Sequence, residues 1–107
     1  MSDYESVLET RDLGPGQSRE VEVRGDRVLL LNIGQIYYAV EARCPESGAA
    51  LEVRTRRQRD RLICPDDAAE YDLASGERLD GSGRPLHRYA VRVEGNVIKV
   101  GPPLVDG

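Results

Sequence analysis

The residues with the clearest potential for chemistry are two cysteines, each followed by proline. Cys44 opens the segment CPESGAAL and Cys64 opens the segment CPDDAAEYDL, with 19 residues between the two cysteines. A carboxylate follows each cysteine closely: Glu46 in the first segment, and Asp66 and Asp67 in the second. Zinc and iron–sulfur sites use thiolates but need four ligands. The two segments therefore look like halves of one metal site. The alternative interpretation is two buried cysteines in turns, which is common for this residue.

The elements that must position these segments are β-strands. Runs rich in β-branched and aromatic residues alternate with turn residues every 8–12 residues or so, and about nine short strands are expected. The clearest runs cover residues 19–33, 35–42, 61–65, 69–73 and 88–100. Turns at Gly25-Asp26 and Gly95-Asn96 divide the first and last runs into hairpins. No segment of useful length has a helical period.

Length and charge narrow the class of protein. The chain has 107 residues, which predicts a single domain over 1–107 with a core of about 5–100 and a short flexible tail at 101–107. A net charge of −4 argues against nucleic acid or anionic membrane as a partner. The acidic N-terminus is unlike a targeting peptide, and no apolar run approaches the ~20 residues of a membrane helix. We therefore expect a cytoplasmic protein.

One strongly basic segment stands out against this acidic background. The sequence RTRRQRDR at 54–61 carries five arginines. We interpret it as a solvated hairpin tip between the two Cys-Pro segments. The alternatives are a basic docking patch for an acidic protein partner, or a nucleic-acid site, although no aromatic residue lies within the run to stack on a base.

The order and spacing of these features along the chain resemble those of the Rieske ferredoxin family. That family has a Cys-x-His loop and, after a spacer of similar length, a Cys-x-x-His loop. Here the first loop continues as Gly-Ala-Ala-Leu at 48–51, and the second leads to Tyr71 and a Ser75-Gly76 turn. The resemblance covers about residues 5–100. It implies an all-β, Rieske-type fold of three small antiparallel β-sheets, with the two Cys-Pro loops at one end.

The departures from the family pattern fall on the residues that would hold a cluster. Glu46 and Asp67 occupy the positions of the two cluster histidines. Asp66 stands where the family has a bulky apolar residue. Ala68 replaces a glycine, and we expect it not to allow the backbone turn that glycine permits at positive φ. The single histidine, His87, matches no ligand position and is expected on the surface.

The resemblance assigns the cofactor-binding positions to Cys44, Glu46, Cys64 and Asp67. In the family both thiolates bind one iron and both imidazoles bind the other. Two carboxylates in place of imidazoles would add two negative charges, so such a cluster would be strongly reducing and labile. We therefore regard the cysteines as possible metal ligands and the carboxylates as poor ones. Without a metal, the resemblance implies that the two cysteines lie close enough to form a disulfide on oxidation.

Three functions are compatible with this pattern. The favoured one is a degenerate Rieske module without a standard cluster, an accessory or interaction subunit like the similar small subunit of assimilatory nitrite reductase. The second is a [2Fe–2S] electron carrier with carboxylate ligation that serves an oxygenase or a reductase. The third is a small cofactor-free enzyme or a zinc protein built on the vacated pocket. Under the favoured hypothesis the partner is a protein such as an oxygenase or reductase subunit. No catalytic residue is assigned, and catalysis is the less favoured role.

Overall fold

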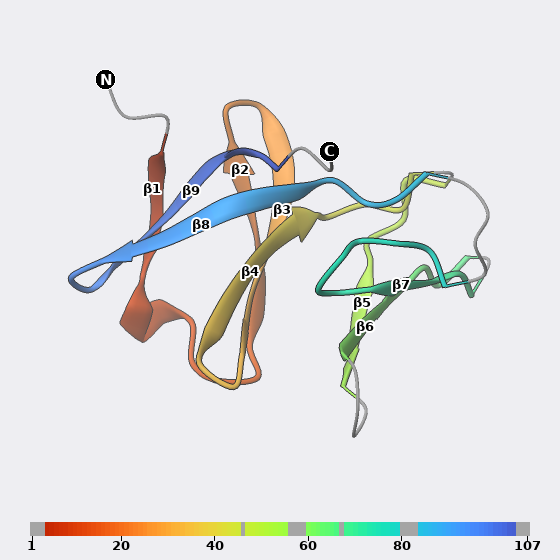
Figure 1. The fold of residues 1–107 in the computed structure, drawn as a ribbon, viewed down its shortest axis with the longest axis horizontal. Helices are drawn as coiled ribbons and strands as arrows, with labels where there is room; N and C mark the ends of the chain where they lie inside the picture. The colour runs from red at the N-terminus through yellow and green to blue at the C-terminus, as the bar shows by residue number, and fades with distance from the viewer. Residues whose placement is uncertain (1–3, 46, 56–59, 67, 80–83, 105–107) are drawn as a thin grey trace.

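β-strands make up nearly all of the regular structure in the described part of the chain. The computed structural model describes residues 4–45, 47–55, 60–66, 68–79 and 84–104. These contain nine strands and one short 3-10 turn (Figure 1). The elements are β1 (Glu5–Glu9), η1 (Thr10–Asp12), β2 (Ser18–Val23), β3 (Asp26–Ile33), β4 (Ile36–Glu41), β5 (Glu52–Thr55), β6 (Asp60–Ile63), β7 (Glu70–Asp72), β8 (Arg88–Glu94) and β9 (Val97–Pro103). The described residues include no helix long and apolar enough to cross a membrane.

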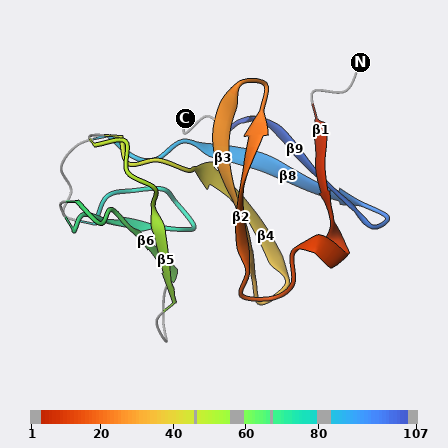
Figure 2. The same ribbon diagram turned by 180° about the vertical axis from the view of Figure 1, so that it is seen from behind.

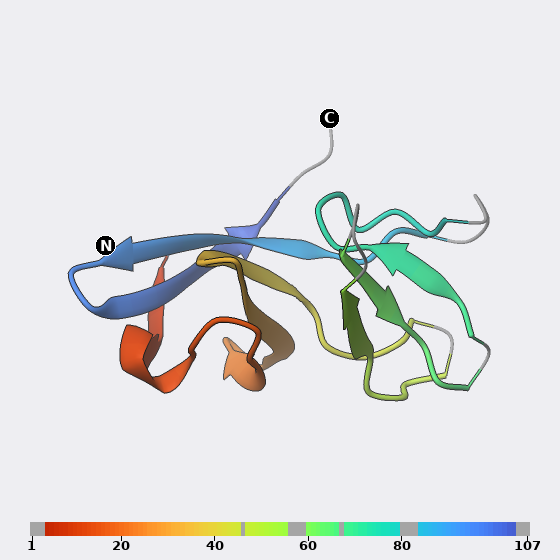
Figure 3. The ribbon, with the colours of Figure 1, turned by 90° about the horizontal axis from the view of Figure 1, so that it is seen from below.

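The described strands form two antiparallel sheets that lie side by side (Figures 2 and 3). The larger has the order β1-β9-β8-β4-β3-β2, and the smaller has the order β5-β6-β7. Three small sheets were expected. The described residues form two because β4 pairs with β8 through Ala39–Tyr89 and Val40–Arg88, which joins hairpins that would otherwise be separate sheets. The larger sheet curls so that β1 approaches β2.

The predicted hairpins are present, with one change in turn position. Glu94 pairs with Val97, so Gly95-Asn96 forms the last turn as predicted. The first turn is Arg24-Gly25, one residue earlier than expected, because Val23 pairs with Asp26. Arg24 has φ 50° and Gly25 has φ 85°. Positive φ at both central residues is the type I′ geometry that matches the twist of paired strands.

Strand β3 separates two apolar cores. Successive side chains of a strand point to opposite faces of its sheet. Val28 and Leu30 pack inside the curled sheet with Ile98 and Val100, whereas Leu29 and Leu31 belong to a second core beside the small sheet. We call this second group the loop core. It comprises Leu29, Leu31, Val40, Ala42, Cys44, Leu51, Leu62, Cys64, Ala69, Tyr71, Leu73 and Leu86.

The ordered strands reach beyond the expected C-terminal boundary. β9 continues through Pro103, past residue 100. The backbone N–H of Leu104 then donates to the carbonyl of Arg88 at 2.7 Å. Residues 101–104 of the predicted tail are thus attached to β8, and residues 105–107 lie outside the described residues.

Candidate functional site

The first Cys-Pro segment is a tight loop that follows β4. The N–H of Cys44 donates to the carbonyl of Ala49 at 2.8 Å, and the N–H of Gly48 donates to the carbonyl of Cys44 at 2.8 Å. Gly48 has φ 78°, a left-handed conformation that glycine adopts without steric cost. Two backbone hydrogen bonds of Cys44 therefore close the loop.

The second Cys-Pro segment connects β6 to β7 with the same backbone pattern. The N–H of Cys64 donates to Ala69 at 2.9 Å, and the N–H of Ala68 donates to Cys64 at 2.9 Å. Ala68 occupies the position equivalent to Gly48 and has φ 60°. The expectation that alanine would not allow this turn was wrong. The two hydrogen bonds to Cys64 and the paired strands on either side impose the conformation despite the steric cost to Cβ.

The two loops touch each other through Ser47. Its Oγ lies 3.5 Å from Sγ of Cys64, and the same Oγ accepts a hydrogen bond from the N–H of Ala49 at 3.2 Å. In the contact between Ser47 and Cys64, either the hydroxyl or the thiol can be the donor. Cys44 and Cys64 are 2% and 0% exposed, and both are in the thiol form. The structure thus brings together the two loops that the sequence singled out.

Large apolar side chains pack in the same core as the two cysteines. Leu62 and Tyr71, which pair across β6 and β7, are buried in the loop core together with both cysteines. Leu86, from the segment before β8, closes the same core. The cysteines are therefore part of a packed interior, and they lie beneath exposed loop residues such as Pro65.

An ion pair between a half-buried glutamate and an exposed arginine, next to the first loop, was not predicted. Arg84 donates to both oxygens of Glu41, at 2.8 and 2.6 Å, and the backbone N–H of His87 donates to Oε1 of Glu41 at 3.0 Å. Burial by itself would raise the pKa of Glu41. The hydrogen bonds from Arg84 and His87 outweigh burial, and the pKa lies below its ordinary value. We call these bonds from Arg84 and His87 to Glu41 the clamp. The clamp holds residues 84–87 against the end of β4, and no local sequence pattern predicts it.

The predicted ligand positions are only partly described. Cys44 and Cys64 are buried in the same core, whereas Glu46 and Asp67 lie outside the described residues. Asp66 is exposed, and so is His87, as predicted. Within the described ranges, no group of three or more His, Cys, Asp or Glu side chains is arranged to hold a metal ion.

The donor set does not fit a standard Rieske cluster. Such a cluster needs two thiolates and two imidazoles. The chain has two cysteines and one histidine, so it lacks one imidazole whatever the loop conformation. The histidine that it has, His87, is exposed and precedes β8 rather than lying in either Cys-Pro loop.

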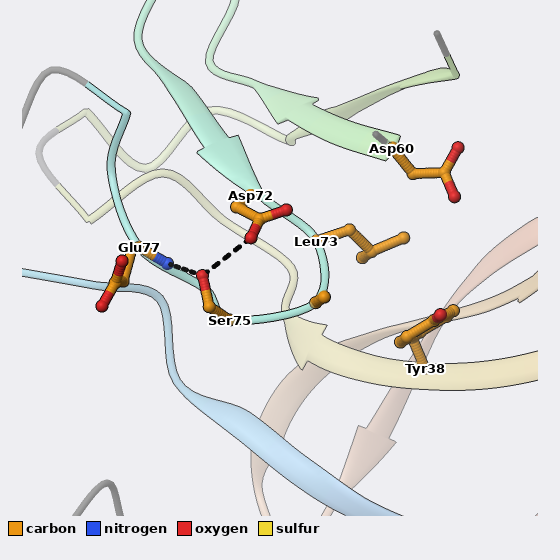
Figure 4. A pocket seen from close by; sticks show the side chains of 7 residues that line it. Tyr38, Asp60, Asp72, Leu73, Ser75 and Glu77 are labelled. Carbon is orange, nitrogen blue, oxygen red and sulfur yellow. Dashed lines mark hydrogen bonds between the residues drawn. The ribbon is translucent and has the colours of Figure 1, made fainter. Parts of the chain in front are cut away.

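A hollow lies at the end of the small sheet that is away from the Cys-Pro loops (Figure 4). β6 enters the second loop at its C-terminal end and β7 leaves it, so Asp60 and Asp72 lie at the end of these strands away from Cys64. The hollow has a volume of about 510 Å³ and is lined by Tyr38, Asp60, Asp72, Leu73, Ala74, Ser75 and Glu77. Ser75 donates to Asp72 at 3.0 Å and accepts from the N–H of Glu77 at 3.2 Å. The sequence analysis assigned no role to these residues.

The fold and the two Cys-Pro loops define a class of small all-β domain, and comparison with known proteins identifies its family. Residues 3–101 match the family model of the Rieske-like [2Fe-2S] domain. The chain belongs to this family.

Two known proteins are similar to most of this chain. The chain is 34% identical over 90 residues to apoptosis-inducing factor 3 of Mus musculus and of Homo sapiens, a match that covers 83% of this chain. It spans only 15% of the length of those relatives.

Solved structures show the same architecture. The ferredoxin of carbazole 1,9a-dioxygenase from Nocardioides aromaticivorans is 26% identical, with a TM-score of 0.80 over 92% of this chain and 97% of that one. A protein described as the small subunit of an NADH-dependent nitrite reductase from Mycobacterium tuberculosis is 25% identical, with a TM-score of 0.80 over 95% and 96%.

Proposed function

We propose that this chain is a degenerate Rieske module that carries no standard [2Fe–2S] cluster and acts as an accessory or interaction unit. The observation that carries the proposal is the donor set. Two buried cysteines remain in contacting loops, whereas the chain has one histidine, outside both loops, and the two family histidine positions are Glu46 and Asp67. A side chain that is no longer required for a cluster can change while the scaffold persists.

The partner that we propose is a subunit or domain of an oxidoreductase. Two similar structures support this, since one is the ferredoxin of a dioxygenase and the other is described as a nitrite reductase small subunit. The match to a small part of apoptosis-inducing factor 3 shows that such a domain also occurs within much longer chains. A cytoplasmic location fits the acidic, polar chain.

A second candidate function is supported by one specific observation. Both cysteines are retained, both are buried, and their loops keep matching backbone bonds. This arrangement would suit a [2Fe–2S] electron carrier with carboxylate ligands, whose potential would lie well below the Rieske range of about −150 to +300 mV because of the added negative charge.

The direct test is the metal content of protein purified without oxygen. We expect no stoichiometric iron or acid-labile sulfide and no visible absorption. Iron and sulfide at about two atoms each per chain would overturn the proposal and establish the electron carrier. Stoichiometric zinc would also overturn it, and would favour a zinc protein built on the same loops.

A reversion experiment separates a lost ligand set from a lost scaffold. The double variant Glu46→His with Asp67→His restores both imidazoles, and Glu46→Gln with Asp67→Asn is the matched control that removes the charges without adding imidazole. After iron–sulfide reconstitution and reduction, we expect a Rieske-type paramagnetic resonance signal in the first variant only. Adding Asp66→Trp should raise its occupancy by covering the site. A folded histidine variant that takes up no cluster would show that the loops themselves had changed.

A further inference from the structure

Contact between the two Cys-Pro loops limits how far apart their cysteines can be. Ser47 Oγ reaches within 3.5 Å of Sγ of Cys64. Ser47 belongs to a loop that is closed on Cys44 by the bonds from Gly48 and to Ala49. The side chain that touches Cys64 is therefore held within one tight turn of Cys44.

Packing places the two cysteines in one environment. Cys44 and Cys64 belong to the same loop core, and both are buried thiols. Each begins its loop at the end of a segment fixed by strands, β4 for the first and β6 for the second. The bridging Ser47 is exposed, as are Pro65 and Asp66, so the sulfurs lie just beneath a surface formed by loop residues.

We propose that Cys44 and Cys64 form a reversible disulfide, a modification site that joins the two loops in the protein without a cluster. This inference rests on the proposed function, because a resident cluster would use both thiolates as ligands. The oxidant by chemical class is a hydroperoxide, and the reductant is a dithiol.

The chemistry balances with these two reagents. One cysteine sulfur attacks the hydroperoxide and breaks its O–O bond, which releases one molecule of alcohol or water and leaves a sulfenic acid. The second sulfur attacks the sulfenic sulfur, the S–S bond forms, and water leaves. Two thiols thus lose two electrons and two hydrogens. A dithiol reverses the reaction by thiol–disulfide exchange through a mixed disulfide.

The bridge would change the mechanics of the small sheet. The ring that it closes contains the 19 intervening residues, including β5 and β6. Closing a chain segment of this length removes conformations from the unfolded state, so the oxidised form should be the more stable one. The two loops would also lose their freedom to separate.

The experiment uses the intact chain, first analysed for iron so that a failure of the proposed function is recognised separately. Iron-free protein is treated with hydrogen peroxide, then denatured and alkylated. We expect a mass loss of ~2 Da per chain, no alkylated cysteine, recovery of both thiols after dithiothreitol, and a higher Tm for the oxidised form. Peptide mapping should show Cys44 linked to Cys64.

Cys44→Ala and Cys64→Ala are the controls. Each keeps one thiol and should show no intramolecular 2-Da loss, with only sulfenic products or intermolecular dimers. If either variant fails to fold, the peptide map of the wild-type protein decides the question alone. Iron-free wild-type protein that stays folded under peroxide and keeps two alkylatable thiols would overturn this inference and leave the proposed function standing. Bound iron would overturn both.

Discussion

The two Cys-Pro loops solve the same backbone problem with different residues. In each, the cysteine accepts a bond from the fourth residue after it and donates to the fifth, and the fourth residue has positive φ. The first loop places Gly48 there, at φ 78°, and the second places Ala68, at φ 60°. Glycine enters this region freely, whereas an L-residue pays roughly 1–2 kcal/mol.

This difference shows that the neighbouring strands, rather than the residue type, determine the backbone conformation of the second loop. The second loop is flanked by β6 and β7, which pair directly with each other on either side of it. The strand pairing fixes both ends of the loop, so alanine follows the backbone conformation that glycine would have adopted. The backbone conformation of the first loop thus recurs in the second, although a different residue occupies the position with positive φ.

Removing a large apolar side chain from the loop core should have the largest effect on stability. Leu62 is fully buried among the loop-core residues. Leu62→Ala should lower the free energy of unfolding by about 2–5 kcal/mol, measured by urea denaturation, because it removes buried contacts and leaves a cavity. Leu104→Ala, at a side chain that is 45% exposed, is the control and should change stability by less than ~0.5 kcal/mol. Similar losses in the two variants would contradict the packing described for the loops.

Another glycine with positive φ, Gly76, tests how much of the stability cost of a substitution comes from steric crowding around the new Cβ. A Cβ at Gly76 would lie 2.6 Å from the carbonyl oxygen of Leu86, whereas a Cβ at Gly48 would meet no atom within 4 Å. Both have φ 78°. Gly76→Ala should therefore cost about 2–3 kcal/mol and Gly48→Ala about 1 kcal/mol. Equal losses in thermal or urea unfolding would mean that the segment at Leu86 moves aside.

Exchanging the residues of the two loops sharpens the comparison directly. Gly48→Ala should destabilise by about 1 kcal/mol, and Ala68→Gly should stabilise by about 0.5–1 kcal/mol, since relief of the left-handed strain exceeds the added entropy of the unfolded chain. The double exchange should be close to neutral in the free energy of unfolding. A loss of stability in Ala68→Gly would show that Ala68 is not strained in the folded protein.

The smallest expected effect comes from the clamp beside the first loop. The folded-state pKa of Glu41 is lowered, so its stabilisation is complete above the ordinary pKa of the group and is lost as pH falls through the lowered value. Glu41→Gln should cost about 1 kcal/mol or less at neutral pH, with the difference from wild type vanishing in acid.

A matched exposed pair provides the control for the clamp. Glu94 pairs with Lys99 at 2.6 Å, and its side chain is exposed. Glu94→Gln should produce a smaller difference that added salt removes, because solvent and ions screen exposed charges. A difference between wild type and Glu41→Gln that persists unchanged at low pH would show that Glu41 acts through packing rather than charge.

Local sequence features predicted the strands well, because β-branched runs and turn residues act over a few neighbours. The turn at Gly95-Asn96 is an example. The turn at Arg24-Gly25 was placed one residue late, since Gly25-Asp26 is also a good turn sequence and only the register of β2 on β3 decides between them. The joining of the hairpins into one sheet depends on β4 meeting β8, which are distant in sequence.

The site shows the same division between local and distant information. The pairing of the Cys-Pro loops followed from the whole-chain resemblance, and the contact of Ser47 with Cys64 supports it. The clamp of Glu41 by Arg84 joins residues 43 positions apart that carry no motif, so it could not be predicted. The roles of Glu46 and Asp67 remain predictions.

The burial of β3 on both faces should couple the two cores in unfolding. Leu30 faces one core and Leu31 the other, so loss of this strand exposes both cores at once. The amide hydrogens of these two residues should exchange with solvent only when the whole chain unfolds, unlike amides in the loops. A protein that binds the small sheet would consequently slow hydrogen exchange in the distant curled sheet as well, because its binding energy adds to the cost of that one global opening.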